Sequence, residues 1–249
     1  MFHSLQYPFP GLILSNRDQF EDYRASHASL LDYRYQYDQN LASKTDVTVQ
    51  GICPLTLERT TFTSPIAGGA KLDDGRVVPH WRASQICGRG VPYADRATAH
   101  YALYVRRGQL GHCLYFSDTE ILSNVIAGRC TSLTRGDIAD LPKLAAGGNT
   151  FDTILVVNKI QGQLELNPAL TQLRKMLADK GRIVFSANFH YFEPHSSRHD
   201  TDGGVYWALG WDFLDRMRNT GMKAAQAVTF WAAETGYLGP FNFLFEATK

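Results

Sequence analysis

Two apolar segments that flank one amphipathic helix constrain the fold of this chain more than any other feature of its sequence. Residues 151–158 (FDTILVVN) and 182–187 (RIVFSA) are short and rich in β-branched residues, which predicts strands buried on both faces of a sheet. Leucines recur at helical spacing over residues 170–177, and we expect that helix to end at Lys180-Gly181. A strand, a helix and a second strand in this order predict a βαβ unit and a parallel sheet.

The neighbouring segments extend this pattern. Upstream we expect strands over residues 112–116 and 132–135 and a helix over residues 119–127. Downstream, a helix over residues 211–219 stops at Gly221, and extended runs over 225–231 and 241–247 are joined by a turn rich in Gly and Pro. The sequence therefore predicts an α/β fold whose mostly parallel sheet ends in an antiparallel hairpin.

The first part of the chain has a different character. Residues 16–41 contain neither Pro nor Gly and predict one long helix, whereas residues 44–89 alternate Thr-rich runs with Pro and Gly, which predicts a small β-rich module. A second helix is expected over residues 94–107, before Gly108. We therefore divide the chain into an N-terminal helix with a β-rich module, residues 1–108, and an α/β domain, residues 109–249.

Composition excludes several classes of function. The chain has 25 Lys and Arg residues against 24 Asp and Glu, so its bulk charge attracts neither nucleic acid nor an anionic membrane. Its apolar runs are far shorter than the roughly 20 residues that cross a bilayer, and residues 1–11 lack the pattern of a signal peptide. We expect a cytoplasmic protein whose four cysteines are reduced.

Several motifs follow one another in a recognisable order. These are a D-x-x-x-L turn over Asp137–Leu141, an F-D strand that begins at Phe151, a helix of the L-R-x-L type from Leu173, and a strand that opens with Lys180-Gly181-Arg182. In this order they resemble the second half of class I S-adenosylmethionine-dependent methyltransferases. The closing segment, residues 210–239, is similar to a type 11-like subgroup found in surface-glycan and secondary-metabolite clusters.

The resemblance covers residues 113–247. It implies a Rossmann-like methyltransferase sheet, S-adenosylmethionine as the cofactor, and methyl transfer to an oxygen or nitrogen of a small molecule or glycan in a biosynthetic pathway. The expected partner is therefore that substrate, without nucleic acid or membrane, and a homodimer is left open.

The same resemblance implies where the cofactor binds. Ligands of such sheets lie beyond the carboxyl ends of the strands, and there Asp137 is expected to accept a hydrogen bond from the adenine amino group, or else to cap a short helix. Asn158 and residues 159–161 follow the next strand, where Asn158 either faces the ligand or completes a turn. Asp118 or Glu120 is expected to hold the ribose, although carboxylates are also favoured at any helix N-terminus. The expected cofactor residues are Ser117, Asp118, Glu120, Asp137, Ile138 and Asn158.

The chain departs from the family in its first half. The glycine-rich turn that lets the backbone approach the cofactor is missing, and residues 114–120 (LYFSDTE) match either the first or the second strand of the family. One βα unit is thus expected to be shortened or absent between Arg107 and Cys130. This departure keeps two other hypotheses open: an enzyme of the same fold that catalyses cyclisation or elimination, and an inactive scaffold that contacts a partner through its aromatic N-terminal helix.

The β-rich module resembles the paired C-x-x-C knuckles of that subgroup. Cys53 and Cys87 remain, but Thr56 and Gly90 stand where the second cysteines are expected. Two thiolates do not complete a tetrahedral zinc site, although His80 or His100 could add ligands. We therefore expect no bound metal.

A dense polar segment, residues 189–200, follows the second buried strand. Its histidines are His190, His195 and His199. An imidazole at this edge could act as the general base that deprotonates the acceptor, and His190 is the preferred candidate because it is nearest to the strand. The alternatives are a metal site, whose ligand spacing is not a known one, and a solvated loop.

Overall fold

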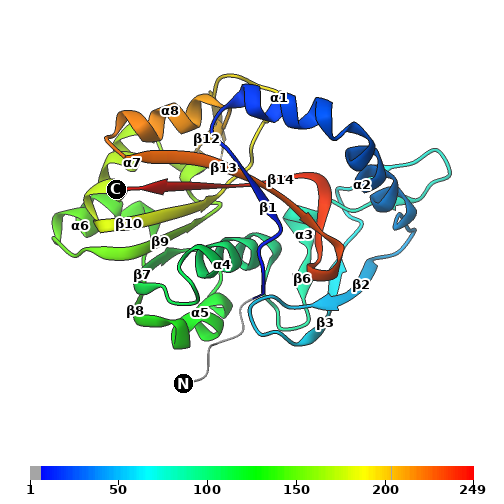
Figure 1. Ribbon diagram of the computed structural model, residues 1–249, viewed down its shortest axis with the longest axis horizontal. Helices are drawn as coiled ribbons and strands as arrows, with labels where there is room; N and C mark the ends of the chain where they lie inside the picture. The colour runs from blue at the N-terminus through cyan, green and yellow to red at the C-terminus, as the bar shows by residue number, and fades with distance from the viewer. Residues whose placement is uncertain (1–6, 203) are drawn as a thin grey trace.

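The computed structural model describes residues 7–202 and 204–249, and a seven-stranded sheet forms its centre (Figure 1). In spatial order the strands are β8 (Cys130–Arg135), β7 (Gly111–Phe116), β9 (Phe151–Val157), β10 (Leu177–Ser186), β14 (Tyr237–Thr248), β13 (Ala224–Ala232) and β1 (Gly11–Leu14). The first four are mutually parallel, and the last three join by antiparallel pairing. The predicted Rossmann-like α/β sheet with a C-terminal antiparallel hairpin is confirmed.

The winding of the sheet reverses at β7. The chain leaves β7 through α5 (Ile121–Ile126) to β8 on one side, and then returns through α6 (Leu141–Ala146) to β9 on the other side. Among the described residues no strand lies beyond β8. On that side of β7 the sheet therefore contains one strand only. Such a reversal is the place where open α/β sheets bind ligands.

Alternating side chains of the strands bury both faces of the sheet. Leu114 and Phe116 of β7 belong to one core cluster, and Cys113 and Tyr115 belong to the other. The first face packs against α1 (Arg17–Ser26), α7 (Leu166–Lys175) and α8 (Asp212–Asn219), and the second packs against α4 (Tyr93–Val105) and α5. The result is a three-layer α/β/α arrangement, with α4 lying across one face (Figure 1).

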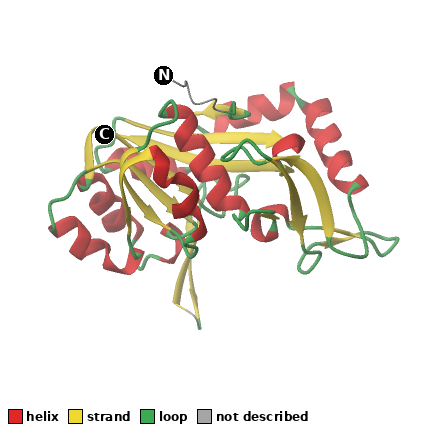
Figure 2. Ribbon diagram, turned by 90° about the horizontal axis from the view of Figure 1, so that it is seen from below, coloured by secondary structure: helices red, strands yellow, loops and turns green. Residues whose placement is uncertain are grey.

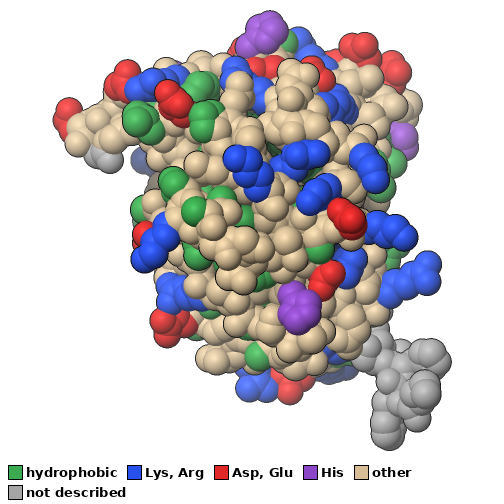
Figure 3. All heavy atoms as spheres, turned by 90° about the vertical axis from the view of Figure 1, so that its left-hand side faces the viewer, with side chains coloured by type: hydrophobic (Ala, Val, Ile, Leu, Met, Phe, Trp, Pro, Cys, Tyr) green, Lys and Arg blue, Asp and Glu red, His purple; other side chains and the backbone are tan. Residues whose placement is uncertain are grey.

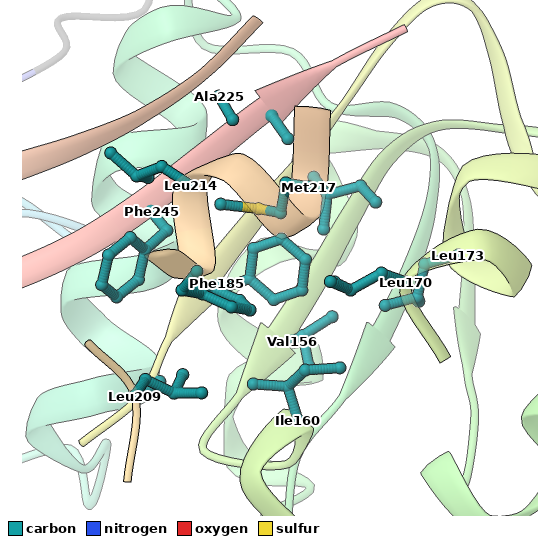
Figure 4. Packing of buried hydrophobic residues seen from close by; sticks show 14 of the residues in the cluster. Val156, Ile160, Leu170, Leu173, Phe185, Leu209, Leu214, Met217, Ala225 and Phe245 are labelled. Atoms are coloured by element: carbon teal, nitrogen blue, oxygen red, sulfur yellow. The ribbon is translucent and has the colours of Figure 1, made fainter. Parts of the chain in front are cut away.

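Aromatic rings fill the first of these cores (Figure 4). Phe185 of β10 and Phe245 of β14 both meet Phe213 of α8 edge to face, with ring centroids 5.7 and 5.1 Å apart. Met217 and Leu170 close the space between α8 and α7. This packing fixes the position of β10 in the sheet, and therefore the position of its carboxyl end.

The predicted end of the helix before β10 is wrong. We expected helix up to Lys180-Gly181, but α7 ends at Lys175 and β10 already begins at Leu177. Leu177 pairs with Phe151, and the register then shifts before Arg182, with Lys180 at a φ of 63°. The pairing of Leu177 with β9 therefore begins a strand in a stretch whose leucine spacing alone indicated helix.

The predicted single N-terminal helix is also wrong, since α1 and α2 (Ala28–Asn40) are separated at His27. The hydroxyl of Ser26 donates to the Asp22 carbonyl at 2.6 Å, and the imidazole of His27 lies 3.1 Å from the Tyr23 carbonyl. These side chains occupy carbonyls at the end of α1, and the chain changes direction there.

The β-rich module comprises two small sheets. One contains β2 (Val47–Ile52), β3 (Arg59–Ser64) and β6 (Ile86–Cys87), and the other pairs β4 (Ala70–Lys71) with β5 (Val77–Val78). The short α3 (Trp81–Ser84) follows. In contrast, β1 and α4 precede residue 109 but form part of the central sheet and its cover.

The surface agrees with the balanced composition. Figure 3 looks onto the side at which the parallel strands begin, and basic and acidic side chains are interspersed there. A hairpin of β11 (Ser197–Thr201) and β12 (Gly204–Ala208) projects from the body of the molecule (Figure 2). Within the described part of the chain, no helix combines the length and the apolar character needed to cross a membrane.

Candidate functional site

Three adjoining clefts lie along the carboxyl edge of the parallel strands. We call them the first cleft, of about 290 Å³, the middle cleft and the inner cleft, of about 330 Å³ each. The first cleft is lined by Phe116, Ser117, Asp118, Arg135, Gly136, Asp137, Ile138 and Lys159. Because β7, β8 and β9 end here, the first cleft lies at the point where the winding of the sheet reverses.

The structure brings four of the six predicted cofactor residues together in the first cleft: Ser117, Asp118, Asp137 and Ile138. Glu120 is not among its lining residues and forms an ion pair with Arg135. Asn158 lines the middle cleft instead.

An ion pair connects the ends of two neighbouring strands in the first cleft. The carboxylate of Asp118, after β7, pairs with the ammonium of Lys159, after β9. The Asp118 side chain is 80% exposed and that of Lys159 is 27% exposed, so a ligand can compete with this pair for either group.

The N-terminus of α4 contacts one lining residue of the first cleft, Ser117. Asp95 of α4 is buried, and it accepts a hydrogen bond of 2.5 Å from the hydroxyl of Ser117. Desolvation raises the pKa of this carboxyl, and the Asp118 charge adds to the increase, whereas the Ser117 hydroxyl opposes it. The predicted cofactor residue Ser117 thus already uses its hydroxyl within the protein.

The turn after β8 presents Asp137 in the first cleft. Gly136 is required there because a Cβ atom would lie 2.6 Å from the ring of Phe116. Asp137 is exposed, and one carboxylate oxygen accepts the backbone N–H of Ala139 at 2.9 Å, which caps the turn Ile138–Asp140. The capping interpretation is confirmed, and the second carboxylate oxygen makes no hydrogen bond within the described part of the chain.

The middle cleft collects neutral polar side chains and one guanidinium. It is lined by His80, Arg82, Ala94, Asn158, Gln161, Asn188 and Tyr206. Asn158 has a φ of 52°, a left-handed conformation that asparagine tolerates better than most residues and that occurs often at functional sites. The hydroxyl of Tyr206 accepts from the amides of Gln161 at 3.1 Å and Asn188 at 2.8 Å, which orients both amides.

Arg82 separates the middle cleft from the inner cleft, and it lines both. Its guanidinium donates to the Ala187 carbonyl, just after β10, at 2.5 Å. Burial lowers the pKa of this group, as expected for a cation with little access to water. Arg82 therefore links the β-rich module to the carboxyl edge of the sheet.

The inner cleft is apolar and contains one buried carboxylate. Its lining residues are Tyr35, Asp38, Gln39, Ala70, Leu72, Val78, Pro79, His80, Trp81, Arg82, Asn188, Phe189, Tyr191, Leu238, Gly239, Pro240, Phe241 and Asn242. Asp38 of α2 is 2% exposed. Desolvation raises its pKa to about 7, although the N–H of Gly239 and the nearby indole of Trp81 lower it.

The three predicted catalytic histidines lie elsewhere. His190, His195 and His199 are exposed, and none of them lines the three clefts. The backbone N–H of His190 donates to the Leu209 carbonyl, and His199 of β11 contacts the hydroxyl of Ser197 at 2.9 Å. The expected loop over residues 189–200 is therefore partly a strand, and His199 belongs to the projecting hairpin.

The knuckle remnants bring Cys53 and Cys87 into contact. The thiol of Cys87 is hydrogen bonded to the sulfur of Cys53, and this bond, with backbone N–H groups of Leu55 and Thr56, lowers the pKa of Cys53 to about 5. His100 cannot complete a metal site, because its ring nitrogens contact the Tyr237 hydroxyl and the Tyr7 carbonyl. Over residues 7–202 and 204–249, no group of three or more His, Cys, Asp or Glu side chains could hold a metal ion.

Sequence reasoning missed several polar residues that line the clefts, among them Asp38, Arg135, Asn188 and Tyr206. The position of Asn188 just after a buried strand was a signal that could have found it, by the reasoning that found Asn158. Asp38 had no such signal, because α2 carries polar and aromatic residues all around its axis.

Comparison with known proteins gives structural neighbours only. The chain matches no protein-family model and no curated protein sequence. A solved N1-methyltransferase from Burkholderia thailandensis, with bound 1,6-didemethyltoxoflavin and S-adenosylhomocysteine, is 14% identical with a TM-score of 0.46, over 63% of this chain and 78% of that one. The N-methyltransferase NodS from Bradyrhizobium japonicum is 16% identical with a TM-score of 0.40, over 63% and 87%.

A sugar N-methyltransferase from Streptoalloteichus is 13% identical with a TM-score of 0.41, over 63% of this chain and 86% of that one. All three scores are below 0.5. The function proposed next therefore rests on the strand order and the residues of this chain itself.

Proposed function

We propose that the chain is an S-adenosylmethionine-dependent methyltransferase that acts on an oxygen or nitrogen of a small molecule or glycan. The observation that carries this proposal is the first cleft, which lies where the sheet reverses and presents Asp137 at the end of the second strand of a βαβ unit. In such units an acidic residue about 20 positions beyond the first strand's turn binds ribose hydroxyls. Asp137 follows Asp118 by 19 positions (137 − 118).

This topology changes the expected role of Asp137. The sequence suggested that Asp137 contacts adenine and that Asp118 or Glu120 holds the ribose. Since β8 lies directly beside β7, we propose that Asp137 is the ribose ligand and that its second carboxylate oxygen accepts hydrogen bonds from the hydroxyls. Asp118 then faces the part of the cofactor nearest to β7, and the adenine lies toward Ile138, which is half-buried.

The middle cleft is the place for the acceptor atom in this proposal. When bound, the cofactor would supply an electrophilic methyl group: an oxygen or nitrogen lone pair of the acceptor would bond to the methyl carbon in line with the breaking carbon–sulfur bond, and S-adenosylhomocysteine would leave. Most of the catalysis is then positioning, and a base is needed only if the acceptor must lose a proton. Asn158, Asn188 and Tyr206 offer oriented polar groups for that positioning.

One observation favours the alternatives, an enzyme of this fold that does not transfer methyl groups or an inactive scaffold. The turn after β7 contains no glycine, and Asp118 there is paired with Lys159. A cofactor that enters the first cleft has to displace or accommodate this pair.

Isothermal titration with S-adenosylmethionine and S-adenosylhomocysteine tests the proposal. We expect saturable heat with each compound and a concentration-dependent rise in melting temperature, since a ligand that binds only the folded state stabilises it. Loss of the heat in Asp137→Asn, but not in Asp140→Asn, would locate binding in the first cleft. An absence of heat and of thermal shift at millimolar concentrations of both compounds would rule the proposal out.

A further inference from the structure

We propose that the inner cleft is the acceptor-binding site and that it selects an amine-bearing molecule, whose ammonium group pairs with Asp38 while its hydrocarbon part contacts the aromatic walls. This inference rests on the proposed function, because it names the class of substrate. It is independent of which atom of that substrate receives the methyl group.

The buried carboxylate of Asp38 has neutral donors beside it but no cationic partner among the described residues. Its Oδ2 accepts the backbone N–H of Gly239 at 3.0 Å, and the indole N–H of Trp81 also interacts with the carboxylate, but neither Oδ1 nor that N–H makes a hydrogen bond of regular geometry within the described residues. A buried carboxylate oxygen without a partner is costly, so such groups are paired in most folded proteins. Asp38 lines the inner cleft, where a bound cation would supply the missing partner.

The walls of the inner cleft suit a hydrocarbon body. Trp81, Phe241 and Tyr191 line the cleft together with Leu238 and Pro240, and Leu72, Val78 and Phe189 add further apolar surface. Aromatic faces attract cations as well as hydrocarbon groups, so they also stabilise an ammonium group within about 6 Å of a ring centroid. Side chains of this kind around one acid fit a small organic amine better than a hydrated metal ion.

The Arg82 guanidinium and the Asp38 carboxylate determine the orientation of the amine. Arg82 and His80 line the inner cleft where it joins the middle cleft, whereas Asp38 projects from α2. An ammonium group is repelled by the Arg82 guanidinium and attracted by Asp38. The amine therefore binds at the α2 end, and the rest of the molecule extends toward the middle cleft.

The groove next to the inner cleft also favours a cation. A wide groove of about 500 Å³ between α1, α2 and the start of β14 shares Tyr35, Tyr191 and Phe241 with it. The groove is lined by the acidic residues Glu21 and Asp32 and by one basic residue, Arg24, which pairs with Glu21. Asp32 thus adds a negative charge to this groove.

The inner cleft adjoins the middle cleft, where the proposed reaction places the acceptor atom. The inner and middle clefts share His80, Arg82 and Asn188. β14 pairs with β10 only over residues 245–248, so the residues 238–242 of β14 that line the inner cleft lie beyond the end of β10, on the same side as the middle cleft. A small molecule anchored at Asp38 can therefore reach the middle cleft.

Matched pairs of probes test the inference without the cofactor. We would measure the affinity of the purified protein for tyramine and its alcohol counterpart tyrosol, and for cyclohexylmethylamine and cyclohexylmethanol, at about pH 8, where Asp38 is ionised and the amines are protonated. We expect each amine to bind about ten- to a hundredfold more tightly than its alcohol, the range typical of a hydrogen bond to a charged group. Equal binding within both pairs would overturn the inference.

Two asparagine variants locate the effect. Asp38→Asn keeps an oxygen for the Gly239 N–H and is expected to remove the preference for amines, whereas Asp32→Asn, on the exposed side of the same helix, is expected to retain it. Circular dichroism confirms that both variants fold. If Asp32→Asn removes the preference and Asp38→Asn does not, the amine binds in the outer groove and the inference is wrong.

The experiments distinguish a failure of the amine-site inference from a failure of the methyltransferase proposal. Heat with S-adenosylhomocysteine but no preference for amines would contradict the acceptor site and leave the methyltransferase proposal standing. A preference for amines that depends on Asp38, without any heat from either cofactor compound, would contradict methyl transfer and support an amine-binding cleft on its own.

Discussion

The ammonium of Lys159 and the carboxylate of Asp118 form an ion pair between the ends of β9 and β7, and both side chains line the first cleft. The pair ties two neighbouring parallel strands together at the point where the winding of the sheet reverses. An exposed pair of this kind contributes less than about 1 kcal/mol to stability, so its main consequence concerns ligands.

Substitution of this pair should change cofactor affinity in opposite directions. Lys159→Met removes a positive charge that competes for Asp118, so we expect the cationic S-adenosylmethionine to bind up to about fivefold more tightly. Asp118→Asn removes the carboxylate, and we expect weaker binding. Titration calorimetry on both variants measures this, and weaker binding by Lys159→Met would instead identify Lys159 as a cofactor ligand.

Asp137→Asn should weaken cofactor binding without unfolding the turn. Asparagine caps helices about as well as aspartate, so the hydrogen bond from the Ala139 N–H survives. The lost charge should lower affinity for S-adenosylhomocysteine about ten- to a hundredfold. Asp140→Asn, in the same turn but outside the cleft lining, is the matched control, and equal affinities for the two variants would remove Asp137 from the site.

His190→Ala tests the catalytic role that the sequence suggested. If His190 is the general base, turnover should fall about a hundredfold while cofactor affinity stays unchanged. His195→Ala and His199→Ala serve as comparisons, because both residues are equally exposed on the same segment. Full turnover by the His190 variant would assign this segment to the solvated surface.

Asp38 should make the protein less stable as the pH rises from about 4 to about 7. Its folded-state pKa of about 7 lies above the ordinary value of 3.8, so between these values the folded state binds more protons than the unfolded state. Its stabilising contribution is complete below the ordinary pKa and is lost as the pH passes through the raised one. The loss is on the order of 4 kcal/mol, since each unit corresponds to about 1.4 kcal/mol.

Urea unfolding of the wild type and of Asp38→Asn across this range measures the effect. The stability of the variant relative to the wild type should increase up to about pH 7 and then level off. A constant difference between the two proteins would show that Asp38 keeps an ordinary pKa.

His100 should have the opposite dependence. Burial lowers its pKa from 6.5 to about 4, so the folded state resists protonation that the unfolded state accepts. The stability that depends on neutral His100 is present above pH 6.5 and is lost, by about 3 kcal/mol, as the pH falls to about 4. His100→Gln should be less stable at neutral pH but less sensitive to acid, and an unchanged acid sensitivity would contradict the assignment.

The sequence by itself determined the elements whose patterns are local. The apolar runs that became β9 and the end of β10 are buried on both faces of a sheet, and their composition admits little else. The antiparallel hairpin of β13 and β14 was equally evident, because the two runs and the turn between them are contiguous. The same reasoning placed Asp118, Asp137 and Asn158 at the carboxyl edge, since each directly follows a strand.

Only the tertiary structure decided which side chains face one another. Leu177 belongs to β10 rather than to α7 because Phe151 pairs with it, a contact that helical spacing cannot reveal. Asp38 is 201 positions from its hydrogen-bond donor Gly239, and Lys159 is 41 positions from Asp118. Local spacing reports which face of an element is apolar, but the burial and the partner of a charged group depend on segments that only the packed fold brings together.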